Sequence, residues 1–91
     1  MNIEEVLKQK PHSVHYLNRY IKFIKYIYNN NNNKNSIEYY ENHHICPKAK
    51  DMFPEYKSIK LNPWNNIRLT PRQHFIAHWL LFKSYNTTSQ A

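Results

Sequence analysis

Glycine is absent from this sequence of 91 residues, and cysteine occurs once, as Cys46. Without glycine the chain lacks the glycine-rich loops that cradle phosphates in Walker and dinucleotide-binding motifs, which argues against a nucleotide-driven enzyme. A single cysteine forms no disulfide within the chain, so we expect a reducing, cytoplasmic environment. No apolar run approaches the roughly 20 residues that span a bilayer, and we therefore expect no membrane partner.

Acidic residues are also scarce, with 6 Asp and Glu against 13 Lys and Arg, which gives a formal net charge of +7. An excess of this size favours a polyanionic partner, because Lys and Arg neutralise phosphates and release condensed counterions. The alternative is a charged surface that contacts only solvent. Charge alone does not decide between the two. A chain of this length forms one domain at most.

Helical patterns occupy the N-terminal third. Residues 1–10 predict a short helix that Pro11 interrupts, and Ser13 is a suitable N-cap for a second helix. Apolar residues then recur at spacings of three or four, which predicts one buried helix face made of Val14, Leu17, Ile21, Ile24 and Tyr28. The asparagine-rich segment 29–36 disfavours helix and is expected to be a loop or linker.

Two short strands and a helix are predicted in the remainder of the chain. Residues 37–42 are strand-like, and residues 67–69 alternate apolar and charged side chains. Thr70 is a predicted N-cap for a helix over 71–83, whose first residue is a proline. We expect that helix to bury, to varying degrees, Phe75, Ile76, Trp79, Leu80 and Phe82.

Four histidines are placed in patterns that suit a metal site. His43 and His44 are adjacent at a strand end, where successive side chains point to opposite faces, so one can bind a metal while the other faces a substrate. His74 and His78 are four residues apart on the predicted helix and share one face. Three histidines around one ion would leave positions open for water or a phosphate oxygen. Each pair alone is common by chance, so the pairs carry weight only together.

Two segments together resemble the HNH nuclease family. Residues His43–Pro47 have the pattern His-His-Ile-x-Pro, and residues Asn65–His78 have the pattern Asn-x-Ile-x-Leu-Thr-Pro-Arg-x-His-x-x-x-His. The sequence is similar especially to phage-type HNH homing endonucleases, and more distantly to the colicin DNases. The helix around residues 20–24 fits the aromatic and basic helix that precedes the first motif in that family.

This resemblance implies an α+β fold with a ββα-metal core, in which two antiparallel strands, a loop and a helix hold one divalent ion. The core would span residues 37–84, preceded by one or two helices and the Asn-rich linker in 1–36, and followed by a flexible tail in 85–91.

The resemblance also assigns roles to residues that match the family motifs. His43 corresponds to the metal ligand of the first strand, and His44 to the general base that activates water. Asn65 corresponds to the Asn that pins the loop and orients the base. His74 and His78 correspond to metal ligands on the helix, the second of them typical of the colicin-like branch.

Three positions leave alternatives open. The family loop commonly carries a Gly-Gly turn, whereas residues 48–52 contain no glycine. The motif Asn is doubled: counting back from His74 selects Asn65, which we prefer, whereas the sequence Asn-Ile-Arg selects Asn66. Glu41 stands where related enzymes carry an acidic residue that holds a histidine, and it is equally well explained as a surface charge.

The expected function is therefore metal-dependent hydrolysis of DNA phosphodiester bonds, with nicking by a monomer. We expect Mg²⁺ or Mn²⁺ to support activity, whereas Zn²⁺ or Ni²⁺ can occupy a histidine site. The residues expected to bind DNA phosphates are Arg68, Arg72, Lys48 and Lys50. A homodimer or a separate DNA-recognition partner would supply the recognition of a DNA sequence, for which we expect a short chain to have little room. The alternative function is a DNA-binding module, either an inactive HNH relic or a metal-stabilised domain that does not cleave.

Overall fold

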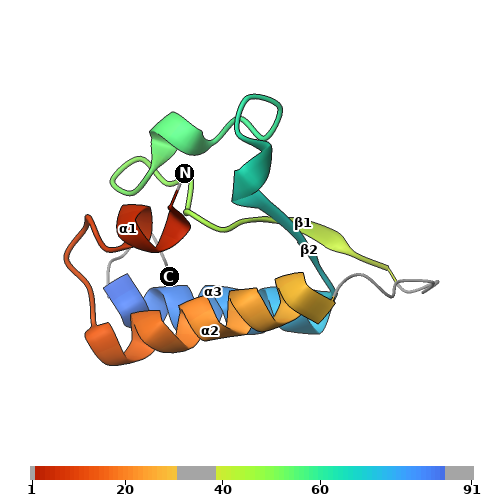
Figure 1. Ribbon diagram of the computed structural model, residues 1–91, viewed down its shortest axis with the longest axis horizontal. Coiled ribbons are helices and arrows are strands. Elements are labelled where there is room, and N and C mark those ends of the chain that lie inside the picture. The colour runs from red at the N-terminus through yellow and green to blue at the C-terminus, as the bar shows by residue number, and fades with distance from the viewer. Residues whose placement is uncertain (1, 31–38, 86–91) are drawn as a thin grey trace.

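Helices and a small sheet make up the computed structural model, which describes residues 2–30 and 39–85. Helices α2 and α3 lie side by side in one layer, and the two strands with the long loop between them lie over that layer (Figure 1). The predicted α+β class, with helices ahead of a strand pair and a helix after it, is confirmed. No helix within the described residues combines the length and the apolar character needed to cross a membrane.

The two N-terminal helices begin close to where the sequence predicts them. Helix α1 spans Ile3–Leu7, and helix α2 spans Val14–Asn30. The Ser13 hydroxyl accepts a hydrogen bond from the Tyr16 amide at 3.3 Å, as an N-cap does. Helix α2 continues through residues 29 and 30, so the prediction of a loop over 29–36 was wrong for these two residues. Residues 31–36 lie outside the described part of the chain.

Two of the five residues predicted for the buried face of α2 do not lie on it. Val14 and Tyr28, in the first and last turns, are exposed, so their predicted burial was wrong. Tyr20 and Ile27 are buried instead. The residues that this helix contributes to the core are Leu17, Tyr20, Ile21, Ile24 and Ile27.

The sheet consists of strand β1, Glu41–His44, and strand β2, Asn66–Leu69, which pair antiparallel. Strand β1 therefore includes the two histidines and begins at the end of the predicted segment 37–42, of which residues 37 and 38 are not described. In the register, His43 faces Ile67 and His44 faces Asn66. His43 is buried and His44 is only partly buried, so the predicted alternation between the two faces is present.

Without glycine, the loop between the strands folds through short 3₁₀ turns. These are η2, Pro54–Tyr56, and η3, Pro63–Asn65, each with a proline in its first position. A backbone bond from Met52 N–H to Ala49 C=O, at 2.9 Å, closes a further turn ahead of η2. The loop returns the chain to β2 directly beside the end of β1.

Helix α3, Pro71–Tyr85, packs along α2. Its predicted face is partly wrong, because Phe75 is 73% exposed and Trp79 is 46% exposed. The buried residues are Ala77, Leu80, Leu81, Ser84 and Tyr85. Tyr85 is not part of a flexible tail, since its hydroxyl donates to the Leu7 carbonyl at 2.6 Å and ties α3 to α1. Residues 86–91 lie outside the described part.

Candidate metal centre

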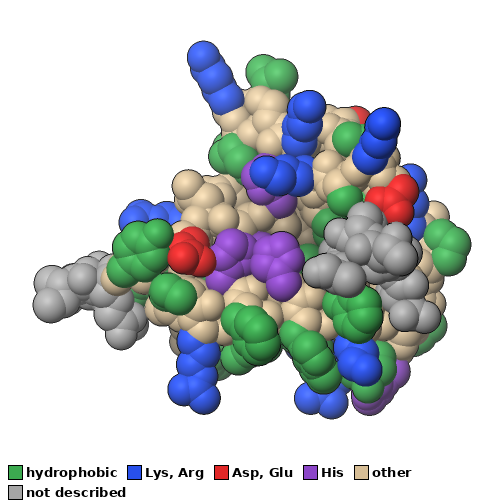
Figure 2. All heavy atoms as spheres, turned by 180° about the vertical axis from the view of Figure 1, so that it is seen from behind, with side chains coloured by type: hydrophobic (Ala, Val, Ile, Leu, Met, Phe, Trp, Pro, Cys, Tyr) green, Lys and Arg blue, Asp and Glu red, His purple; other side chains and the backbone are tan. Residues whose placement is uncertain are grey.

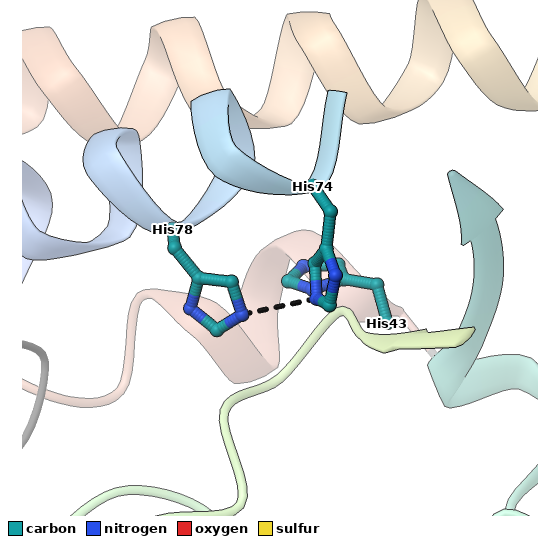
Figure 3. Close-up of side chains that lie close together, drawn as sticks. All are labelled: His43, His74 and His78. Atoms are coloured by element: carbon teal, nitrogen blue, oxygen red, sulfur yellow. Dashed lines mark hydrogen bonds between the residues drawn. The ribbon is translucent and has the colours of Figure 1, made fainter. Parts of the chain in front are cut away.

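Three histidines from two elements converge between the sheet and α3. His43 comes from β1, and His74 and His78 come from α3 (Figure 3). One ring nitrogen from each lies within 4.8 Å of those of the other two. The sequence predicted this grouping, and the role of the three as ligands stays a prediction.

His43 is oriented by a hydrogen-bond chain that starts on α2. The Tyr20 hydroxyl donates its proton to the Ile45 carbonyl at 2.7 Å. Its oxygen therefore accepts from His43 Nε2–H, which lies 2.8 Å away. The other ring nitrogen, Nδ1, is buried and has no hydrogen-bond partner among the described residues. A buried lone pair without a partner is unfavourable unless something binds it, so Nδ1 fits a metal.

The charge state of His43 also fits a ligand. His43 is only 1% exposed, and burial lowers its pKa to about 3, with smaller contributions from His78 and His74. The ring is therefore neutral at physiological pH, which is the form that binds metals. Burial likewise raises the pKa of the Tyr20 hydroxyl well above its usual value, so Tyr20 keeps the proton that it donates.

The two helix histidines face each other through their Nε2 atoms. Glu41 Oε1 accepts from His74 Nδ1–H at 2.7 Å, which leaves His74 Nε2 as a lone pair. That atom lies 3.1 Å from His78 Nε2. Burial, followed by the charge of His74, lowers the pKa of His78. Glu41 therefore holds a histidine, as the resemblance implied, rather than standing as an isolated surface charge.

The donor set is chemically selective. Three imidazole nitrogens suit first-row divalent ions such as Zn²⁺ or Ni²⁺ and leave coordination positions open. The buried thiol of Cys46 is not among the side chains that lie close enough together to hold one ion, which within the described residues are His43, His74 and His78. The residues present thus fit one divalent ion held by histidines.

His44 lies outside this cluster, on the opposite face of β1. A carbonyl can only accept, so the contact of 2.8 Å between His44 Nε2 and Lys57 O places a proton on Nε2. His44 Nδ1 is then the basic nitrogen of the ring. This arrangement suits a proton acceptor, and the catalytic role of His44 stays a prediction.

Asn65 is fully buried and is the last residue of η3, directly before β2. Its Oδ1 accepts from the Cys46 amide at 2.6 Å, and its Nδ2 donates to the carbonyls of Cys46 and Tyr56 at 3.2 and 3.1 Å. The buried Oδ1 of Asn66, in contrast, has no hydrogen-bond partner in the described part of the chain. Asn65 is thus the residue that pins the segment after His44 to the end of the loop.

The four basic residues predicted to bind phosphates are exposed but are not gathered at one point. Lys48 and Lys50 lie in the loop after β1, and Arg72 lies in the first turn of α3. The Arg68 guanidinium stacks 5.6 Å from the centroid of the Tyr40 ring. Figure 2 shows histidine side chains in the middle of one face, an acidic side chain beside them, and Lys and Arg side chains projecting around them.

Tyr20 is the polar residue at this site that the sequence did not indicate. It was placed only in the helix ahead of the first motif, and its contact with His43 joins residues 23 positions apart. The available signal was its spacing from Leu17 and Ile24, which puts a tyrosine on an otherwise aliphatic buried face.

Comparison with known proteins finds a similarity to a phage endonuclease. No family model matches the sequence, and no solved structure matches it. The sequence is 38% identical over 73 residues, or 79% of the chain, to the probable mobile endonuclease B of Enterobacteria phage T4. The chain spans 25% of the length of that protein. The similarity supports the endonuclease prediction, and the narrower HNH assignment stays a proposal.

Proposed function

We propose that the chain is an HNH-type, metal-dependent endonuclease that hydrolyses DNA phosphodiester bonds. The observation that carries the proposal is the convergence of His43, His74 and His78 within 4.8 Å, with Nδ1 of His43 buried and unpartnered. The similarity to a phage mobile endonuclease supports DNA as the substrate. A homodimer, or a separate partner that recognises DNA, remains part of the proposal.

The three histidines would hold one divalent ion, with Glu41 fixing the ring of His74. When bound, such an ion supplies electrostatic stabilisation of the negative charge that develops on phosphate oxygens. We propose Mg²⁺ or Mn²⁺ as the ion that supports activity, and Zn²⁺ or Ni²⁺ as ions that also occupy the site.

His44 is the proposed general base. The Lys57 carbonyl holds the Nε2 proton at 2.8 Å, so Nδ1 is available to take a proton from the attacking water. Asn65 supports this role indirectly, because it fixes the backbone of the segment that begins two residues after His44. We propose Asn65 rather than Asn66 as the motif Asn on this ground.

Exposed cations would bind the DNA backbone. Arg72 stands two residues ahead of His74 on α3, and Arg68 pairs with Asn42 on the sheet face that also carries His44. Lys48 and Lys50 extend from the loop after β1. Such contacts position the duplex and carry no sequence preference of their own.

The test is conversion of supercoiled plasmid to the nicked form by the full chain with Mg²⁺, Mn²⁺, Ni²⁺ or Zn²⁺, with and without chelator. Wild type should nick DNA only in the presence of an ion. His44→Ala should slow nicking by about 100- to 10,000-fold, the usual contribution of a general base, and should leave metal affinity unchanged. His15→Ala, which removes an exposed histidine of α2, is the matched control and should nick at the wild-type rate.

Two results would contradict the proposal. Equal nicking by wild type and His44→Ala would remove His44 from catalysis. DNA binding without cleavage under every ion would instead identify a metal-stabilised binding module or an inactive HNH relic.

A further inference from the structure

We propose that Tyr20 is a positioning residue of the metal centre, which fixes the tautomer of His43 so that Nδ1 is the nitrogen that binds metal. This inference rests on the proposed metal site. It assigns a role at that site to α2, a helix that otherwise only supports the nuclease core.

The first step is the direction of the two hydrogen bonds at Tyr20. A tyrosine hydroxyl has one proton, and the backbone carbonyl of Ile45, 2.7 Å away, can only accept it. The oxygen of Tyr20 is therefore left as an acceptor towards His43 Nε2, at 2.8 Å. A neutral imidazole has one N–H, so Nε2–H leaves the lone pair on Nδ1.

The second step is the surroundings of His43. The edge of the ring that carries Nε2 faces Tyr20, and the ring lies 5.1 and 5.2 Å, centroid to centroid, from those of His74 and His78. Nδ1 is buried without a partner among the described residues. If the proton moved to Nδ1, His43 would lose both its bond to Tyr20 and its free ligand nitrogen.

The third step is that Tyr20 is not free to move. It is fully buried, and it anchors the Ile45 carbonyl in the segment whose next residue, Cys46, is held by Asn65. Partners that orient a metal-binding histidine through its second nitrogen commonly affect metal affinity by about 10- to 100-fold. Glu41 does this for His74, and Tyr20 would do it for His43 without adding a negative charge.

The chain contains a matched control for Tyr20. Tyr85 is also buried, and its hydroxyl also donates to a backbone carbonyl, that of Leu7, at 2.6 Å. Tyr85 has no hydrogen bond to a histidine among its described contacts. Tyr20→Phe and Tyr85→Phe therefore remove the same group from similar surroundings, and only the first should act on metal binding.

The experiment titrates Zn²⁺ alone into the metal-free full chain and follows binding by calorimetry. Tyr20→Phe should weaken Zn²⁺ binding by about 10- to 100-fold. Tyr85→Phe should bind as wild type does, although both variants lose thermal stability. Equal affinity in wild type and Tyr20→Phe would overturn the inference. Absence of Zn²⁺ binding in wild type would instead contradict the proposed metal site itself.

A second measurement tests the inference on the wild type alone, so it does not depend on whether a variant folds. Long-range ¹H–¹⁵N correlation spectra of the metal-free wild type report the tautomer of each histidine. We expect His43 as the Nε2–H form, and in Tyr20→Phe a mixture of both forms. His43 found as the Nδ1–H form in wild type would overturn the inference, whatever the stability of the variant.

Discussion

Asn65 satisfies three backbone groups with one side chain. It accepts from the amide of Cys46 and donates to the carbonyls of Cys46 and Tyr56, all in a region where Asn65 is fully buried. Water cannot replace the two buried bonds to Cys46 without entering the core. At the scale of single residues, the segment that follows His44 is therefore fixed by an amide side chain from the far end of the loop.

Asn65→Ala should lower the free energy of unfolding by at least about 2 kcal/mol, since it orphans two buried groups of Cys46 and each such group costs about 1–3 kcal/mol. Asn66→Ala, its neighbour and matched control, should cost much less, because the buried Oδ1 of Asn66 has no partner to lose. Urea denaturation of both variants measures the difference. Equal losses would indicate that Asn65 does not pin the loop.

Residue spacing and the motif resemblance together predicted the histidine grouping, but not its hydrogen bonds. His74 and His78 share a face because a helix repeats every 3.6 residues, and the motif resemblance brought His43 to them. The contact of Tyr20 with His43 depends on how α2 packs against the sheet. No local pattern encodes that distance between elements, so Tyr20 could be predicted as buried but not as a partner of the metal centre.

Among the elements, α3 shows why the buried face was mispredicted. Apolar side chains occur all around this helix, so their spacing alone does not select one face. In the structure, the small residues Ala77 and Ser84 are buried, and His74 and His78 lie beside His43 of β1. Phe75 and Trp79 each follow a histidine by one residue, about 100° around the helix, which turns them outward.

The start of α3 should matter to metal binding as well as to stability. Thr70 Oγ1 accepts from the Gln73 amide at 3.2 Å, and Gln73 Oε1 accepts from the Thr70 amide at 3.0 Å, which forms a capping box. Thr70→Ala should cost about 1 kcal/mol and loosen the turn that carries His74, so Zn²⁺ affinity should fall.

Ser13 provides the control for this prediction, because its hydroxyl caps α2 through the Tyr16 amide at 3.3 Å. Ser13→Ala should lose a similar amount of stability in thermal denaturation and keep its Zn²⁺ affinity. If both variants lost affinity equally, the effect would reflect general destabilisation rather than the position of His74.

Over the whole molecule, the candidate metal centre joins three elements that are far apart in the sequence. Helix α2 supplies Tyr20, strand β1 supplies Glu41 and His43, and α3 supplies the other two histidines. The sequence predicted which elements would form, but their relative placement depends on packing that is spread over the chain. The buried, neutral histidine at the junction has a consequence for the stability of the fold as a whole.

The metal-free protein should lose stability on acidification below about pH 6.5. Burial lowers the pKa of folded His43 to about 3, whereas the ordinary value of 6.5 applies once the chain unfolds. Between these values the unfolded state binds one proton more, so stability is present above pH 6.5 and falls as the pH decreases towards 3. The loss is about 1.4 kcal/mol for each pH unit and each such group.

His78 acts in the same direction, because burial also lowers its pKa. The measurement is the urea midpoint of the metal-free chain at several pH values from 7.5 to 4. His43→Gln, which keeps an amide donor near Tyr20 but cannot take up a proton, should flatten the profile. His15→Gln removes an exposed histidine and should leave the profile unchanged. A wild-type profile that is flat between pH 7 and 5 would show that His43 is not held neutral by the fold, and its buried position could then not supply a ligand ready for metal.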